Sequence, residues 1–274
     1  MTASTQDKGK LFSNMHLRER AFVMPNVWDA GTARLMAGLG FKAVATSSAA
    51  LAATLGRRDG QVARDEAIAH ARAIVIATKL PVSADLEQGY GDAPKIVAQT
   101  IAMAGEIGLA GGSIEDASGR AGDPIYDIGF AVERVAAAVE AKRALPYEFT
   151  LTARAENYLH GRADLDDTIR RLQAYEQAGA DVLFAPGLPD LDAVRTVCAS
   201  LTKPVSFMAA IPGKSFTVAE LQAAGVKRIT LAASLHRAAM TGLLAAAREV
   251  AEKGSFGYLD GLVSSSELNE IMKS

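Results

Sequence analysis

The chain has 274 residues, of which 49% are hydrophobic and 22% are charged, and its formal net charge is −2. This length suits one large domain with a sizeable core. The balanced charge offers no basic surface to nucleic acid or to an anionic membrane, and no apolar run reaches the roughly 18 residues of a membrane helix. We therefore expect neither kind of partner. The single cysteine, Cys198, excludes an internal disulfide, and the start of the chain lacks a secretory apolar core, so the cytoplasm is the expected location.

Short apolar runs alternate with helical stretches along the chain, after a polar lead-in and short helix over about residues 1–18. The runs are rich in Ala, Val, Ile and Leu and do not alternate in polarity, which is typical of parallel strands buried on both faces. We predict eight strands, over residues 21–25, 43–47, 80–85, 111–116, 149–154, 182–186, 204–209 and 228–233.

Helices are predicted between the strands by apolar positions at spacings of three and four residues. Glycines end several of these stretches, at Gly40, Gly108, Gly179 and Gly225, because glycine adopts positive φ at a helix end without steric cost. The clearest helices cover residues 94–107, 131–144, 164–178, 217–223 and 236–252. Eight such units favour a (β/α)₈ barrel of the TIM type. An open doubly wound sheet is the alternative, although the G-x-G-x-x-G turn of its nucleotide-binding form is missing.

The domain organisation follows from the lack of any linker or low-complexity stretch. We expect residues 1–274 to form a single barrel domain, with an extra C-terminal helical region over about residues 253–274. Part of that region is expected to form a further helix that docks on another subunit.

Polar side chains follow the second to fifth predicted strands, and in a barrel of this kind the carboxyl ends of the strands form the active-site rim. In chain order these residues are Thr46, Ser47, Ser48, Asp85, Glu87, Glu115 and Arg154.

The three acids in this set indicate a metal site. Carboxylates that converge at one rim resist ionising together, and a divalent cation removes that penalty. Oxygen ligands without a nearby histidine or cysteine favour a hard ion, so Asp85, Glu87 and Glu115 predict Mg²⁺, with Mn²⁺ as the alternative. Arg154 offers a planar fork to the carboxylate of a small acid substrate.

Structural explanations compete with these assignments. Asp85 alone could be the N-cap of the next helix, and Arg154 could simply pair with Glu156. Ser47 and Ser48 could only begin a loop, and Asp59 precedes a glycine in a common turn pair.

Several motifs resemble the isocitrate lyase/phosphoenolpyruvate mutase superfamily, over about residues 20–250. The most specific is PVSADLEQGYG (81–91), and MPNVWDAGTARL (24–35), GGSIED (111–116) and LTARAENYL (151–159) add to it. The resemblance implies that Asp85, Glu87 and Glu115 hold Mg²⁺, partly through water. It also implies a homotetramer in which neighbouring subunits exchange the last barrel helix.

The same resemblance assigns the remaining rim residues. Ser47 and Ser48 match the positions that hold the oxo-carboxylate end of the substrate, and we place Thr46 and Asp85 with them as substrate-binding residues. Arg154 matches the family's substrate arginine. Asp59 matches an aspartate that the mutase branch keeps near its substrate, and we expect Asp59 and Arg154 to be catalytic.

Two departures from the family pattern narrow the function. The segment after Glu115 reads DASGRAGDPIYD (116–127) and lacks the cysteine and histidine of the isocitrate and methylisocitrate lyases. The mutase branch carries a histidine just past the sixth strand, where this chain has Pro186. The glycine-rich loop 117–127 remains a candidate lid.

The favoured function is a Mg²⁺-dependent lyase that forms or cleaves a bond next to a small 2-oxo acid. Its chemistry would pass through a pyruvate enolate, on an oxaloacetate-, malate- or isocitrate-like acid. The first alternative is a C–P bond enzyme, related to phosphonopyruvate hydrolase or phosphoenolpyruvate mutase. The second alternative is a barrel that binds a metabolite without turning it over.

Overall fold

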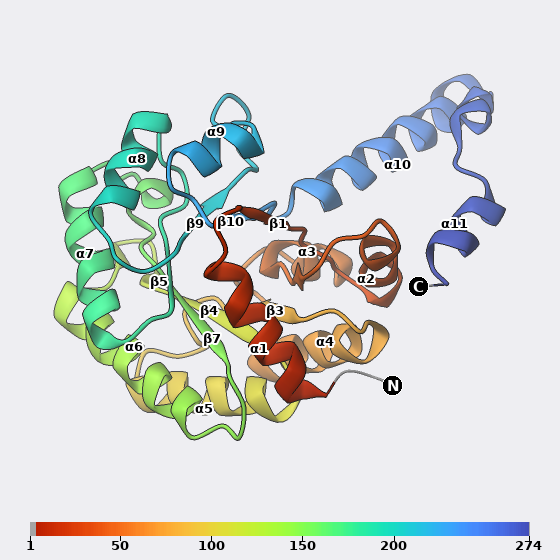
Figure 1. Ribbon diagram of the computed structural model, residues 1–274. Helices are drawn as coiled ribbons and strands as arrows, with labels where there is room; N and C mark the ends of the chain where they lie inside the picture. Colours follow the sequence, from red (N-terminus) through yellow and green to blue (C-terminus); the bar gives the residue numbers. More distant parts are fainter. Residues whose placement is uncertain (1–3, 274) are drawn as a thin grey trace.

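An eight-stranded parallel sheet forms the centre of the molecule, which we describe from a computed structural model over residues 4–273 (Figure 1). Residues 1–3 of the expected lead-in and residue 274 of the expected tail lie outside the described residues. The strands are β1 (Phe22–Met24), β2 (Val44–Ala45), β3 (Val82–Asp85), β4 (Gly111–Glu115), β7 (Thr150–Arg154), β8 (Val182–Phe184), β9 (Val205–Met208) and β10 (Arg228–Thr230). Their spatial order is β1-β10-β9-β8-β7-β4-β3-β2.

The sheet curls until its two edge strands meet. Asn26, just past β1, forms an isolated parallel bridge with Ala45 of β2. The amide of Val27 donates to the carbonyl of Ala45 at 2.7 Å, and the amide of Ala45 donates to the carbonyl of Pro25 at 2.9 Å. The predicted barrel class is therefore confirmed, and each of the eight predicted runs contains one strand.

Helices surround the barrel, one after most strands, and cover its apolar outer face (Figure 1). They are α2 (Ala30–Gly38), α3 (Ser48–Thr54), α4 (Arg64–Ala77), α5 (Pro94–Glu106), α6 (Ile128–Arg143), α7 (Leu165–Ala178), α8 (Leu191–Ala199) and α9 (Val218–Ala223). The short apolar strands are buried between these helices and the barrel interior, which explains why the strand sequences do not alternate.

The N-terminal helix α1 (Thr5–His16) lies across the end of the barrel at which the strands begin. Phe12 is fully buried and belongs to the same apolar cluster as Met15 and Met24. Gly9 permits this approach, because a Cβ there would lie 2.2 Å from the carbonyl oxygen of Glu148. The opposite end of the barrel is left for the active-site rim.

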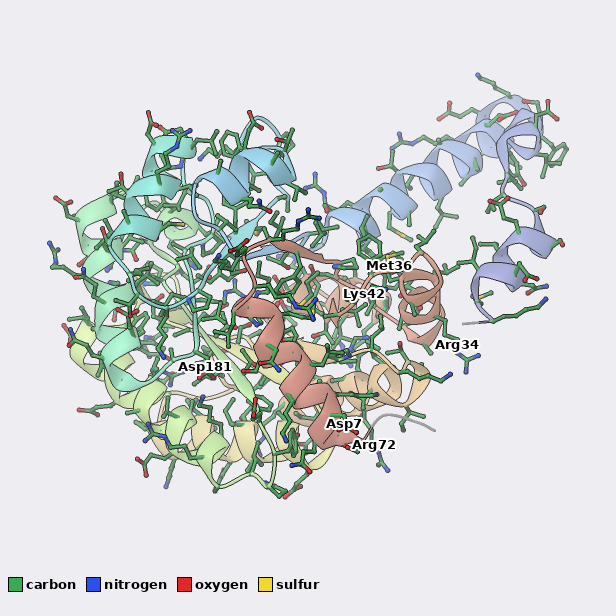
Figure 2. All side chains as sticks on the ribbon, viewed as in Figure 1. Asp7, Arg34, Met36, Lys42, Arg72 and Asp181 are labelled. Atoms are coloured by element: carbon green, nitrogen blue, oxygen red, sulfur yellow. The ribbon has the colours of Figure 1, made fainter. Side chains whose placement is uncertain are left out.

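The C-terminal region forms an arm that leaves the barrel (Figures 1 and 2). It comprises α10 (Ser234–Lys253), the 3₁₀ turn η2 (Gly257–Gly261) and α11 (Ser265–Ile271). Only His236 is buried along the 20 residues of α10, and α11 returns to contact α2, where Ile271 packs on Gly38. The predicted extra helical region is therefore confirmed, but α10 does not pack along the barrel as the helices before it do.

The segment expected to be a glycine-rich loop is instead a β-hairpin. It pairs β5 (Ala117–Arg120) with β6 (Asp123–Ile125) in antiparallel fashion. Gly119 has φ +70° in this turn, and Arg120 holds the hairpin to the β3–α5 loop through Asp92 at 2.8 Å. No alternating pattern in this segment is long enough to reveal such short strands.

Over residues 4–273, no helix is both long and apolar enough to cross a membrane.

We predict that α1 contributes substantially to stability through Phe12. Phe12→Ala removes a fully buried ring and leaves a cavity, so the free energy of unfolding should fall by about 3–5 kcal/mol. Urea unfolding followed by circular dichroism measures this change.

Leu11→Ala on the same helix is the matched control, because Leu11 is 41% exposed. Its effect should stay below about 0.5 kcal/mol. Equal losses in the two variants would show that α1 does not close the barrel as described.

Candidate active site

Backbone and hydroxyl groups join the ends of β2 and β3. The Thr46 hydroxyl accepts a hydrogen bond from the amide of Asp85 at 2.9 Å. The amide of Ser48 donates to Oδ2 of Asp85 at 3.1 Å. Ser47 is the N-cap of α3, and its hydroxyl accepts from the amide of Ala50 at 3.3 Å. The structure thus brings Thr46, Ser47, Ser48 and Asp85 together, and Asp85 does not cap the helix that follows it, which begins at Pro94.

Arg154, the last residue of β7, stands at the centre of the site and contacts three carboxylates. Its Nη1 lies 3.0 Å from Oδ1 of Asp85, and its Nη2 lies 3.2 Å from Oε2 of Glu115. The same Nη2 lies 2.8 Å from Oε1 of Glu156. Arg154 therefore does pair with Glu156, as the structural explanation of this arginine proposed. That pair is one of three ion pairs that join the ends of β3, β4 and β7.

Burial sets the acid–base properties of this group of charges. Desolvation raises the pKa of Glu115 well above its ordinary value, with Arg154 acting in the opposite direction. Desolvation also raises the pKa of Glu156, again opposed by Arg154. For Glu87, burial followed by the charges of Asp85 and Asp59 raises the pKa to about 7. Each raised pKa means that the ionised form of the carboxyl group is disfavoured here, although Arg154 stands beside these acids.

Glu87 has a geometry that suits a cation ligand. Its backbone takes φ +48°, which is strained for a residue other than glycine. Its Oε1 is buried and has no hydrogen-bond partner among residues 4–273. An orphaned buried carboxylate oxygen is costly unless a donor or a cation meets it.

The residues predicted to hold the metal offer only oxygen ligands, as Mg²⁺ prefers, and Mg²⁺ also retains several waters. Over residues 4–273, no three acidic, histidine or cysteine side chains are grouped closely enough to enclose a metal ion directly, and Arg154 lies between Asp85 and Glu115. A cation held partly through water, as the sequence comparison implied, needs no such enclosure. The residues present therefore fit the ion.

Asp59 lies on the loop between α3 and α4, at the mouth of the site. Its Oδ1 accepts from the amide of Gly60 at 3.2 Å, as in an ordinary Asp-Gly turn. Partial desolvation raises its pKa, a hydrogen bond with Ser48 opposes this, and Asp85 raises it further. Asp59 is thus both a turn residue and a neighbour of the predicted substrate serine.

Two cavities meet at the rim. The first has a volume of about 200 Å³ and is lined at its mouth by Thr46, Ser47, Ser48, Asp59, Asp85 and Arg154, and at its floor by Arg228. The second, of about 410 Å³, is lined by Ser48, Asp59, Glu87, Glu115, Arg154, Glu156 and His160. Every predicted site residue lines one or both cavities, which is the arrangement expected for a small-molecule site.

Some residues of the site carried no clear sequence signal. Asn26 is one of them. Its side-chain Nδ2 donates to the carbonyl of Thr46 at 2.7 Å, and its Oδ1 accepts from the hydroxyl of Thr230 at 2.7 Å. Glu156 and His160 lie on the turn after β7, and Arg228 begins β10. The position of Glu156 beside Arg154 was the one visible hint, since strand ends supply rim residues.

Comparison with known proteins agrees with this geometry. The family model described as phosphoenolpyruvate phosphomutase matches residues 12–251 of the chain. The chain belongs to the isocitrate lyase/phosphoenolpyruvate mutase superfamily.

Individual relatives cover most of the chain. A structure of a provisionally named lyase/mutase from Burkholderia cenocepacia J2315 is 49% identical, with a TM-score of 0.96 over 98% of this chain and 97% of that one. An uncharacterized protein of Mycobacterium tuberculosis is 31% identical over 88% of this chain and 89% of its own length. The oxaloacetate decarboxylase of Ectopseudomonas mendocina is 30% identical over 74% of this chain and 70% of its own length.

We predict that Arg154 stabilises the empty site. Arg154→Met leaves Asp85, Glu115 and Glu156 buried without their cation, so the free energy of unfolding should fall by about 3–5 kcal/mol. Chemical unfolding without divalent ions measures this loss.

Arg162→Met provides the control, since Arg162 is an exposed arginine near the same rim whose only ion pair, within residues 4–273, is with Asp123 at 3.8 Å. Its change should remain within about 0.5 kcal/mol. An Arg154 variant as stable as the Arg162 variant would refute the charge arrangement described above.

Proposed function

We propose that the protein is a Mg²⁺-dependent lyase that makes or breaks a bond adjacent to a small 2-oxo or 2-hydroxy acid. The observation that carries this proposal is the contact of Arg154 with Asp85 and Glu115 beside the hydroxyls at the end of β2. Membership of a superfamily whose relatives include an oxaloacetate decarboxylase supports the substrate class. A fold alone would not, because one barrel hosts many reactions.

The residues present divide the work among binding, charge balance and shielding. Ser47 and Ser48 offer donors to the carboxylate end of the acid at the N-terminus of α3. Arg154 lines the same cavity, and its guanidinium would pair with the carboxylate of the acid. Asp85, Glu87 and Glu115 would hold Mg²⁺, partly through water. When bound, the ion would supply the positive charge that stabilises an enolate oxygen.

We assign proton transfer to Asp59, at the mouth of the first cavity. Asp59 contacts Ser48 and has a raised pKa, so it holds a proton more readily than an exposed aspartate. The β5–β6 hairpin flanks the second cavity through Ala117 and Gly119, and we assign it the role of keeping bulk water from the reacting acid.

A C–P bond reaction is the second candidate. The match to the phosphoenolpyruvate phosphomutase model and the position of Asp59 at the rim favour it. Pro186 after β8, in place of the mutase histidine, speaks against it. A non-catalytic binding role fits less well, since binding alone does not require the acidic residues that surround Arg154.

We predict that Glu115→Ala abolishes turnover that depends on Mg²⁺ and leaves the fold intact. The loss should be at least about 100-fold, because a metal ligand and a partner of Arg154 are removed together. The assay incubates oxaloacetate, phosphonopyruvate, 2-methylisocitrate and 2,3-dimethylmalate with Mg²⁺ or with EDTA, and NMR identifies the products.

Glu133→Ala, an exposed change on α6, should retain full activity. Full activity of the Glu115 variant would overturn the metal-site assignment. Release of phosphate from phosphonopyruvate, with no change in the carboxylic acids, would favour the second candidate function.

We also propose that the barrel domain, residues 1–274, assembles into a homo-oligomer through its C-terminal arm, as a tetramer with exchanged helices. A 20-residue helix that buries one residue of its own chain gains little from packing. The arm carries exposed apolar side chains: Leu243, Leu244, Val250, Phe256, Leu259, Leu262 and Val263. Apolar surface of this extent indicates a protein partner, and a second copy supplies a matching vacant position along the barrel. The cytoplasmic location stays a prediction.

We predict that the double variant Phe256→Asp/Leu259→Asp dissociates the oligomer, because each change buries a charge in an apolar contact. Size-exclusion chromatography with light scattering should report a smaller mass than for the wild type. Leu17→Asp, at the C-cap leucine of α1 that is 74% exposed, should leave the mass unchanged. A monomeric wild type would contradict the proposal.

A further inference from the structure

Arg228 occupies an unusual position for a charged side chain. It is the first residue of β10, only 3% exposed, and it lines the floor of the 200 Å³ cavity below the rim. Its Nε donates to the hydroxyl of Ser206 at 3.0 Å, and its Nη2 donates to the hydroxyl of Thr152 at 3.0 Å. Its Nη1 lies 3.4 Å from Nε2 of His16 on α1.

The contacts of Arg228 differ from those of the other buried arginines. Arg154 contacts three carboxylates, and Arg171 contacts Asp116 at 3.2 Å and Asp167 at 2.8 Å. Arg134 donates to three backbone carbonyls and lies 4.4 Å from the ring centre of Tyr126. Among residues 4–273, Arg228 has only two hydroxyls and a histidine as partners. Its charge is therefore buried without a negative partner, which is strongly unfavourable unless an anion completes it.

The electrostatic environment of Arg228 also favours a bound anion. Burial, followed by repulsion from Arg154, lowers the pKa of Arg228 to about 9. Burial, followed by repulsion from Arg228, lowers the pKa of His16 to about 3, so the imidazole is neutral at pH 7 and adds no charge. Both shifts show that positive charge is disfavoured at this point and that negative charge would be stabilised.

Hydroxyl groups stand among apolar side chains in the barrel interior around Arg228. The core of such a barrel is usually filled by branched apolar side chains. Here the cavity above Arg228 is lined by Ser83 of β3 and Ser113 of β4, and hydroxyls from β7 and β9 bond to the guanidinium. These groups hold the guanidinium in place but leave two of its five N–H donors without a protein partner, since three are used. Arg228 and the rim residues Asp85 and Arg154 line one and the same cavity.

We propose that Arg228 forms an anion-binding position at the floor of the barrel cavity, where it holds the second anionic group of a dianionic substrate. The assignment to a substrate rests on the function proposed above. It makes the preferred acid one with two anionic ends, the first at the Arg154 rim and the second below it. Thr152, which contacts Arg228, lies two residues before Arg154, a separation of about 7 Å along β7. A four-carbon dicarboxylate spans a comparable length. A free inorganic anion is the other source of the same chemistry.

The first experiment measures melting temperatures without divalent ions, at constant ionic strength, as inorganic phosphate is added. Binding to the folded state raises the melting temperature. At about ten times the dissociation constant, the wild-type protein should melt about 3 °C higher. Arg228→Lys should keep part of this shift because it keeps the charge, and Arg228→Gln should lose it.

The second experiment compares succinate with butyrate, which differ in one carboxylate, in the presence of Mg²⁺. If the substrate supplies the anion, succinate should stabilise the wild type more than butyrate, and Arg228→Gln should remove this difference. If a free anion supplies it, phosphate alone should give the Arg228-dependent shift and the two acids should behave alike.

The control variant is Arg237→Gln, on the exposed face of α10, which should respond to each anion as the wild type does. An Arg228→Gln protein that responds to every anion as the wild type does, or a wild type that responds to none, overturns the proposal. Because the phosphate arm needs neither Mg²⁺ nor turnover, it separates failure of this site from failure of the proposed lyase activity.

Discussion

The contact of one guanidinium with three carboxylates is the interaction on which the candidate site depends. Arg154 joins the carboxyl ends of β3, β4 and β7 through Asp85, Glu115 and Glu156. Burial raises the pKa of Glu87, Glu115 and Glu156, and the neighbouring acids raise it further, while the single charge of Arg154 lowers it. A divalent cation at the rim would supply the positive charge that the protein alone lacks there. In the function that we propose, this cation, Arg154 and the acids act as one electrostatic unit.

The sign of the charged side chains changes along the barrel axis, from the acidic rim to the floor of the cavity. The rim is rich in carboxylates, whereas the floor holds Arg228 with only neutral partners among the described residues. A molecule with a metal-chelating end and a second anionic end matches both halves of this arrangement. A monoanion matches only the rim. The geometry thus connects the charge pattern of the barrel to the class of acid that it would select, a property that the fold alone does not determine.

Much of the architecture is predictable from the sequence because its causes are local. Runs such as residues 182–186 are apolar on both faces, and a glycine ends the helix before them, so strands and their order along the chain can be inferred. The rim residues follow, because Asp85, Glu115 and Arg154 end consecutive inner strands. Non-local features were not predictable. The β5–β6 hairpin depends on the contact of Arg120 with Asp92, and the departure of α10 from the barrel depends on a surface that another copy would cover. The isolation of Arg228 appears only when Thr152, Ser206 and His16 are placed around it.

The exchange of pyruvate methyl protons with D₂O tests the central claim most directly. An enzyme that stabilises a pyruvate enolate at this rim must remove and return a proton at the methyl carbon, whatever bond its natural substrate carries there. NMR should show exchange that requires Mg²⁺, stops with EDTA and is lost when Arg154 is replaced by Met. Exchange at the uncatalysed rate with Mg²⁺ present, in a protein that binds pyruvate, would contradict the enolate-centred account.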